Sequence, residues 1–193
     1  MAIDLSSTPI TGKPNGFTEG LTGQGEAVSW QVLEDPSAPG GRVIAETSRD
    51  TADYRFPLCI YDGLVATDAE VSTWFKAVDG QVDQAAGLIV RAQDHLNYYV
   101  ARANALENNV SLYYTLHGRR NTLKYVDAPV ASKQWHTLRV EFAGRHIEVS
   151  LDGKRYIQFD DDHIADKGAV GVWTKADSVT LFDDFTYGSS APR

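Results

Sequence analysis

The chain has 193 residues and a formal net charge of −8, with 18 Lys and Arg residues against 26 Asp and Glu residues. A length somewhat above the ~150 residues of an average domain, with 42% hydrophobic residues, is typical of one folded domain and excludes disorder as the main state. The acidic balance argues against nucleic-acid binding, which needs a clustered basic face, and no apolar run approaches the ~18 residues of a membrane span.

The N-terminal residues carry no sign of a targeting segment. Residues 1–6 lack a basic region followed by an apolar one, so we expect either a cytoplasmic protein or an extracellular or periplasmic one whose signal peptide was removed. Small, polar, turn-forming residues predict an irregular lead-in over 1–15, ahead of a single domain over 16–188 and a short tail over 189–193. The single cysteine, Cys59, excludes an intramolecular disulfide, and its apolar neighbours predict a buried thiol.

Short β-rich runs separated by turn residues make up most of the chain. A Pro/Gly cluster at 35–41 separates predicted strands at 28–33 and 42–46, and Asp152-Gly153 marks a hairpin. Turns roughly 8–12 residues apart are typical of an antiparallel sandwich or barrel. Residues 71–85 also fit a helical spacing, but their β-branched residues favour a strand. The further predicted strands are 64–77, 87–93, 98–103, 110–116, 123–126, 135–142, 146–151, 155–159, 169–174 and 179–187.

Several motifs in these strands resemble those of a known superfamily. They are Trp-x-x-Leu-x-Val at 135–140, Leu-Asp-Gly at 151–153 and Gly-x-Val-Gly at 168–171, together with the stretches 87–91, 97–102 and 182–185. In this order they resemble the concanavalin A-like lectin/glucanase superfamily, and most of all the bacterial 3-keto-disaccharide hydrolases and their laminin-G-like relatives. The resemblance implies an all-β fold, a two-sheet antiparallel jelly-roll sandwich. It also implies carbohydrate as the ligand, on a concave sheet face or its rim loops.

Catalytic residues are not identified by any motif. The glucanase branch of the superfamily carries Glu-x-Asp-x-x-Glu on one strand, which sets carboxylates on one face, and this sequence lacks that triplet. Glu70, Glu107 and Asp177 stay as candidate acids without a pairing motif.

No sequence motif identifies metal ligands either. The acids Asp160, Asp161 and Asp162 predict a solvated turn, with a structural calcium site as the alternative. The five histidines show no metal-binding spacing, so we expect no cofactor apart from that calcium.

Cations, amides and aromatic residues give a better candidate binding site. Alternation along a strand places Arg102 on the same face as Tyr98, and a hairpin through Asp94 and His95 would bring Arg91 to the other end of that surface. Both arginines could instead pair with an acid such as Glu70 or Asp183 across the sheet. The remaining candidate ligand-binding residues, with polar groups suited to sugar hydroxyls or a ring suited to stacking, are Asn104, Trp173, Lys175 and Asp177.

Most aromatic residues are explained by the strands themselves. The adjacent pairs Tyr98–Tyr99 and Tyr113–Tyr114 must send one ring to each face of a strand. The tryptophans at 30, 74 and 135 are expected in the core, which leaves Trp173 as the candidate stacking platform.

Three functions from different classes remain open on the sequence. A non-catalytic carbohydrate-binding domain with an unassigned ligand is favoured, because the two-acid strand is absent and the cation, amide and aromatic set is present. The alternatives are a glycoside hydrolase of the 3-keto-disaccharide hydrolase type and a protein-interaction or structural sandwich. The expected partner is an oligosaccharide or glycoconjugate, and the sequence leaves the oligomeric state open.

Overall fold

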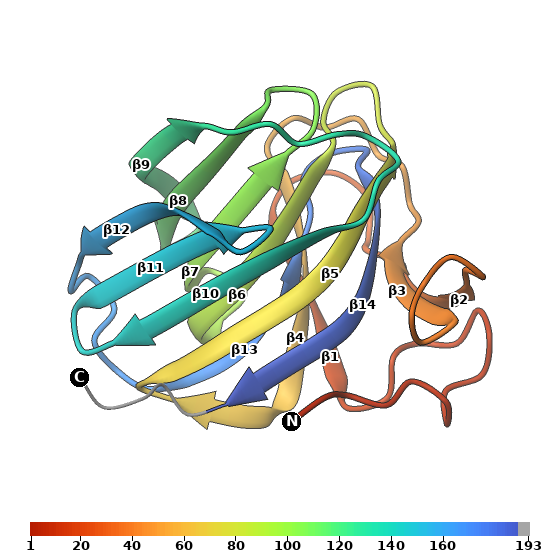
Figure 1. Ribbon diagram of the computed structural model, residues 1–193, viewed down its shortest axis with the longest axis horizontal. Helices are drawn as coiled ribbons and strands as arrows, with labels where there is room; N and C mark the ends of the chain where they lie inside the picture. The colour runs from red at the N-terminus through yellow and green to blue at the C-terminus, as the bar shows by residue number, and fades with distance from the viewer. Residues whose placement is uncertain (189–193) are drawn as a thin grey trace.

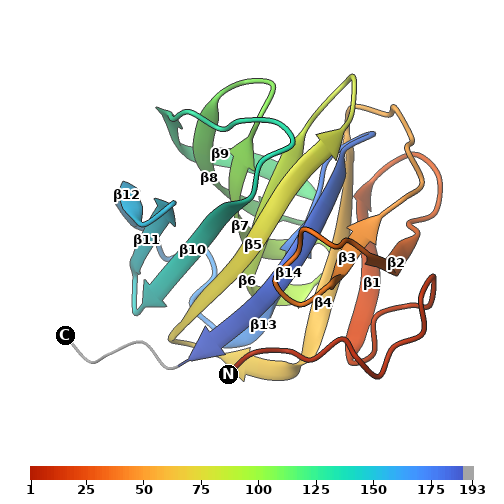
Figure 2. The ribbon, with the colours of Figure 1, turned by 45° about the vertical axis from the view of Figure 1, so that its right-hand side comes forward.

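The structure is a computed structural model that describes residues 1–188. Within these residues, fourteen strands form two antiparallel seven-stranded sheets that pack face to face (Figures 1 and 2). This confirms the predicted all-β, two-sheet sandwich. The described part of the chain holds no helix long and apolar enough to cross a membrane.

The two sheets are built from strands that are far apart in the sequence. Sheet I contains, in spatial order, β1 (Phe17–Gly23), β4 (Arg55–Ala66), β13 (Gly168–Trp173), β6 (Ala85–Asp94), β7 (Asn97–Asn104), β8 (Asn109–Leu116) and β9 (Arg119–Asp127). Sheet II contains β12 (Lys154–Asp160), β11 (His146–Leu151), β10 (His136–Ala143), β5 (Ala69–Asp79), β14 (Val179–Gly188), β3 (Arg42–Glu46) and β2 (Trp30–Glu34).

The main core lies between the sheets and follows from strict alternation. In β10, Leu138, Val140 and Phe142 are buried, whereas Arg139 and Glu141 between them are partly exposed. Each fully buried side chain of this size contributes roughly 1.5–3 kcal/mol relative to exposure, which fixes the register of the strand. Cys59 lies in this core, and burial raises the pKa of its thiol well above the usual value, as expected for an inert structural cysteine.

A second, smaller apolar cluster lies on the opposite face of sheet I, which we call its outer face. Tyr98 and Trp173 belong to it and are fully buried, whereas Tyr99 points into the main core. The predicted division of adjacent tyrosines between faces is confirmed. The edge strand β1 approaches β7 over this face and helps to cover the outer cluster. The Thr22 hydroxyl lies 2.8 Å from the Tyr98 hydroxyl.

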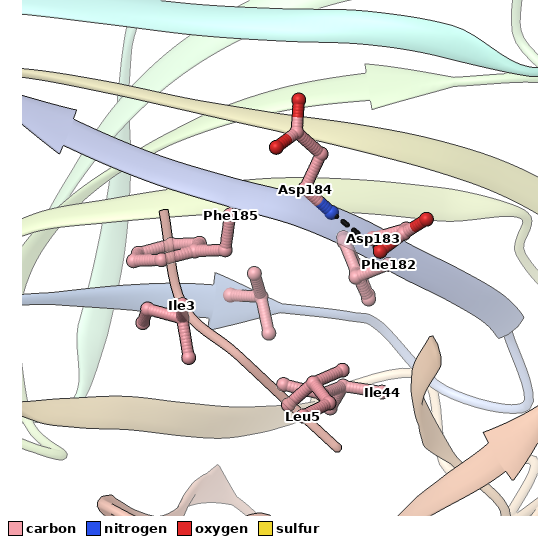
Figure 3. A pocket seen from close by; sticks show the side chains of 8 residues that line it. Ile3, Leu5, Ile44, Phe182, Asp183, Asp184 and Phe185 are labelled. Carbon is pink, nitrogen blue, oxygen red and sulfur yellow. Dashed lines mark hydrogen bonds between the residues drawn. The ribbon is translucent and has the colours of Figure 1, made fainter. Parts of the chain in front are cut away.

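The residues ahead of β1 are partly ordered against sheet II rather than wholly irregular. Ala2 bridges Thr186, and the Ile3 amide donates to the Phe185 carbonyl at 3.0 Å. Ile3 and Leu5 then pack beside Phe185 around a void of about 10 Å³ (Figure 3), which is at most the size of one water molecule. The predicted tail at 189–193 lies outside the described residues.

The N-terminal half differs from the predicted strand pattern. The run at 64–77 is interrupted by a turn at Thr67 and Asp68, where no glycine or proline signals it, and β1 and most of β4 were not predicted. The Asp68 carboxylate accepts the Gly144 amide at 2.8 Å and so holds that turn against the β10–β11 turn. From residue 85 onward the predicted and observed strands agree within two residues at each end, except that β9 begins at Arg119 and not at residue 123.

Two tryptophans expected in the core lie on the surface of sheet II. Trp74 alternates with the buried Phe75 and is 36% exposed. Trp135 lies beside Trp74, with a ring-centroid distance of 6.4 Å, and its indole nitrogen donates to the Ser37 hydroxyl. The prediction for both was wrong because alternation, and not ring size, decides the face. Trp30 is buried as predicted.

Candidate functional site

The strand register gathers the candidate residues on the outer face of sheet I. Trp173, Gly87, Arg102, Ser111 and Tyr125 are direct neighbours across β13, β6, β7, β8 and β9. Directly paired residues in adjacent strands project from the same face, so these positions form one row. A second row, closer to the β7–β8 turn, continues the polar character with Asn104, Asn109 and Asp127.

An aromatic stack forms the floor of this face. Gly87 has no side chain, and the Trp173 indole lies over it so closely that a Cβ there would be 2.8 Å from the ring. The Phe56 ring stacks on Trp173 at a centroid distance of 5.4 Å. The Arg120 guanidinium carbon lies 4.5 Å from the Phe56 centroid and 4.5 Å from that of Tyr113. Trp173 is thus fully buried, and it supports the surface without presenting a free ring face.

Arg120 is a partly buried cation without an ion pair in residues 1–188. Its Nη1 atom is buried and makes no hydrogen bond to the described residues, and no described carboxylate lies within 4 Å of the guanidinium. Burial lowers the pKa of Arg120; Tyr113 opposes this shift and Arg102 adds to it. Two aromatic faces replace part of the lost hydration, since cation–π contacts contribute about 0.5–1 kcal/mol each.

Arg102 is buried and only partly paired. Its Nη2 donates to Glu107 at 2.6 Å and to Asn109 at 3.0 Å, whereas its buried Nε has no described partner. Burial raises the pKa of the Glu107 carboxyl, but hydrogen bonds from Asn109 and the charge of Arg102 outweigh it, so the pKa is lowered. Asn109 donates to the Tyr125 hydroxyl at 2.7 Å, and the Tyr125 ring is half exposed beside this network.

Lys175 links two carboxylates at the edge of the same face. Its Nζ lies 3.0 Å from Asp83 and also pairs with Asp53, whose carboxyl pKa it lowers. Asp83 is buried and accepts a hydrogen bond from Asn104 at 2.6 Å, while the Asp53 side chain is 79% exposed. Lys175 and Asn104 therefore form part of one fixed polar network.

Asp177 accepts hydrogen bonds from the 81–83 loop at this edge of the face. Burial raises the pKa of its carboxyl, but three backbone amides hydrogen-bonded to it, those of Gln81, Asp83 and Val82, lower the pKa below the usual value. The N–H to carboxylate distances are 2.8 to 3.1 Å. Its two oxygens are used to hold the loop that carries Asp83, so Asp177 positions this loop and does not face the outer surface.

The structure does not bring Arg91 to the outer face. Arg91 has a φ of 50° at a β-bulge, where two residues of β6 lie opposite one residue of β13, so alternation breaks. Its guanidinium lies at the end of the sandwich, donating to the carbonyls of Thr67 at 2.9 Å and Ile164 at 3.1 Å and lying over the Phe142 ring. Sequence alternation alone could not show this bulge.

Glu70 lies on the outside of sheet II. There Arg139 hydrogen-bonds its carboxylate and lowers its pKa. It is on the opposite sheet from Arg102, Glu107 and Asp177, so it forms no pair with the other candidate acids.

The three candidate calcium ligands diverge. Asp160 pairs with His146 at 2.7 Å, Asp161 accepts hydrogen bonds from Tyr99 and His163, and Asp162 approaches Arg145 at 3.6 Å. Among the described residues, no group of three or more His, Cys, Asp or Glu side chains is arranged to hold a metal ion.

The outer face offers hydrogen bonding more than acid catalysis. Two of its carboxylates, those of Asp53 and Asp83, share Lys175 as their ion-pair partner. Glycoside hydrolysis needs one carboxyl group with a raised pKa as the proton donor. Every carboxyl pKa found to shift in residues 1–188 is lowered: those of Asp4, Asp35, Asp50, Asp53, Glu70, Glu107, Asp161 and Asp177.

Comparison with known proteins places this geometry in a fold family. The laminin G domain family matches residues 81–172, which contain β6 to β12 and most of β13. The carbohydrate-binding module CBM66 from Bacillus subtilis has a TM-score of 0.70 and 19% identity, over 91% of this chain and 98% of that chain. The chain therefore has the fold of this module, and its central part resembles a laminin G domain. No curated protein sequence matches it.

Two further solved structures share this fold. A Bacillus subtilis protein of unknown function with a galectin-like fold has a TM-score of 0.64 and 12% identity, over 100% of both chains. The GH43 protein BlXynB from Bacillus licheniformis has a TM-score of 0.56 and 14% identity, over 83% of this chain but 37% of that chain. At these identities the likeness concerns the fold, and the narrower resemblance to 3-keto-disaccharide hydrolases stays a prediction.

Sequence reasoning placed part of this site and missed the rest. Of the predicted residues, the outer face and its edge bring together Tyr98, Arg102, Asn104, Glu107, Trp173 and Lys175, with Asp177 behind them. Arg120 and Tyr125 were missed. The His117-Gly118 turn indicates that another strand follows β8, but a register shift between β8 and β9 breaks the alternation, so the sequence pattern does not place Arg120 on this face.

Proposed function

We propose that this chain is a carbohydrate-binding domain without a catalytic acid pair, which holds an oligosaccharide or glycoconjugate on the outer face of sheet I. One observation carries the proposal: the half-exposed ring of Tyr125 lies beside the Arg102–Asn109 network, on the same sheet face as Arg120, which has no ion pair within the described residues. Sugars present hydroxyl oxygens along their edges and C–H groups on their faces. A site that combines fixed donors with an open aromatic ring matches both.

The fixed network around the site supports the same function. Arg102, Asn109 and Tyr125 hold one another through hydrogen bonds of 2.7 and 3.0 Å, so a ligand meets side chains that are already ordered. Pre-ordered groups reduce the entropy lost on binding. The similarity to a solved carbohydrate-binding module of the same fold is consistent with this use.

Asp53 and Asp83 share one cation on this face, and this environment argues against their use as a catalytic acid pair. Both carboxylates pair with Lys175, which lowers the pKa of the Asp53 carboxyl. Release of a reducing sugar from a disaccharide, lost in both Asp83→Asn and Asp53→Asn, would contradict the proposal and restore the hydrolase.

The proposal is tested by screening the full chain on a glycan array and measuring hits by affinity gel electrophoresis. We expect binding at micromolar to millimolar strength and a loss of about tenfold or more in Tyr125→Ala, because hot-spot aromatics commonly contribute more than 1 kcal/mol. Lys124→Ala is the matched control, since Lys124 precedes Tyr125 on β9 and is exposed. Trp74→Ala controls for the exposed ring on sheet II. Binding lost in Trp74→Ala and retained in Tyr125→Ala would assign the ligand to the other sheet.

A further inference from the structure

We infer that the glycan bound on the outer face of sheet I carries an anionic group, a carboxylate or a sulfate, that pairs with Arg120. The inference rests on the proposed function and narrows its ligand class. It follows from a comparison of the buried arginines, from the charges around Arg120 and from the geometry of the guanidinium.

Three arginines of the described chain are buried, and they differ in one respect from the partly buried Arg120. Arg55 lies 3.5 Å from Glu46, Arg91 lies 3.6 Å from Asp68, and Arg102 lies 2.6 Å from Glu107. Arg120 is largely shielded by Phe56 and Tyr113, yet among the described residues no carboxylate pairs with it and no acceptor hydrogen-bonds its guanidinium. A cation removed from water is normally paired, so the missing partner is expected to be a ligand group.

Arg120 is a cation of this face without a described carboxylate within 4 Å, although the charges of Asp83 and Asp53 act on it from farther away. Arg102 and Arg120 approach the same Tyr113 ring, at 5.5 and 4.5 Å from its centroid, so two like charges converge there. Glu107 neutralises Arg102, and Lys175 is shared by Asp53 and Asp83. An anion placed beside Tyr113 would therefore relieve the repulsion between the two guanidinium groups.

The guanidinium is also suited to this ligand by shape. It presents N–H groups in a planar fork that matches carboxylate and sulfate oxygens in a bidentate arrangement. Its plane is confined by contacts with Phe56 and Tyr113, so less side-chain freedom is lost on binding. The Tyr125 ring lies on the same strand and the same sheet face, within the span of a short oligosaccharide.

The test compares an oligogalacturonide with the same oligosaccharide after reduction of its carboxyl groups, and with a sulfated oligosaccharide of equal length. Affinities are measured by titration calorimetry at low and high salt. We expect an anionic probe to bind about tenfold or more tightly than the reduced one, as charge-assisted hydrogen bonds do, and the preference to weaken at high salt. Arg120→Gln should remove the preference, and Arg120→Lys should retain only part of it.

Arg119→Gln is the matched control, because Arg119 is the exposed neighbour of Arg120 on β9 and loses the same charge. Equal affinity for the anionic and reduced probes, with binding still lost in Tyr125→Ala, would overturn the inference and leave the proposed function intact. Binding of no glycan by the wild-type chain would overturn both. A preference for the sulfated probe alone, lost in Arg120→Gln, would support the inference with sulfate as the anion.

Discussion

The Arg120 guanidinium lies 4.5 Å from the centre of the Phe56 ring, although β9 and β4 are separated in sheet I by β8, β7, β6 and β13. Neighbouring strands are about 4.8 Å apart, so a flat sheet would hold these two strands about 24 Å apart. The contact therefore requires a strongly curled sheet. The same curl brings the Tyr54 hydroxyl to the Arg120 amide at 3.0 Å and covers Trp173.

Arg120 is expected to be dispensable for stability. In Arg120→Met, the loss of two cation–π contacts is offset because an unpaired, partly buried charge is removed, so the free energy of unfolding should change by less than about 1 kcal/mol. Arg55→Met is the contrasting variant, since Arg55 is fully buried and paired with Glu46. It should lose about 3–5 kcal/mol. Urea denaturation measures both, and equal losses would show that Arg120 has a structural role.

A methyl group added at Gly87 is expected to destabilise the fold. An added Cβ would lie 2.8 Å from the Trp173 ring and 3.0 Å from Val100, both fully buried, so neither can move away freely. Gly87→Ala should lower the free energy of unfolding by about 1–3 kcal/mol. Gly188→Ala, where a Cβ meets no atom within 4 Å, should change it by less than about 0.5 kcal/mol. No difference between the two variants would mean that the indole does not lie over Gly87.

The fold was predictable from residue 85 onward because the strands there alternate and end in clear turn residues. Asp152-Gly153 predicted the β11–β12 hairpin, which the structure contains. The turn between β4 and β5 carries no such residue, since it is held by Asp68 reaching Gly144 across the molecule. Contacts between residues distant in sequence, like this one, leave no local pattern to detect.

The site was predictable only where it follows from a single strand. Alternation in β7 correctly placed Arg102 with Tyr98. In the neighbouring strand β6 the bulge at Arg91 breaks the alternation, so the predicted position of Arg91 was wrong. Arg120 belongs to the site through the curl of the whole sheet. Its contact with Phe56 joins strands at nearly opposite edges, which no spacing in the sequence reveals.

The two aspartates on Lys175 should contribute unequally to stability. Asp83 is 2% exposed, whereas the Asp53 side chain is 79% exposed and paired in water. Asp83→Asn should cost about 2–3 kcal/mol, less than the ~3–5 of a fully isolated buried pair because Asp53 still neutralises Lys175. Asp53→Asn should cost less than about 0.5 kcal/mol. Thermal or urea unfolding compares them, and a larger loss in Asp53→Asn would contradict the burial of the network.

Asp177 should make the stability of the domain depend on pH in a defined direction. Burial raises the pKa of its carboxyl, but the Gln81, Asp83 and Val82 amides lower it more, so the folded-state pKa lies below the 3.8 of a free aspartate. A group with a lowered pKa stabilises the fold above its unfolded pKa, and this contribution is lost as the pH falls through the folded value. Asp177→Asn should therefore cost about 1–3 kcal/mol at pH 7, where charged acceptors bind these amides most strongly.

The difference between wild type and Asp177→Asn should shrink below about pH 4, because the wild-type carboxylate is then protonated too. Urea denaturation at neutral pH and at several values below pH 4 measures this difference directly. Asp184→Asn, which changes an exposed carboxylate on β14, serves as the control and should show no comparable gap at neutral pH. A gap for Asp177→Asn that stays constant over the whole range would mean that its charge does not hold the 81–83 loop.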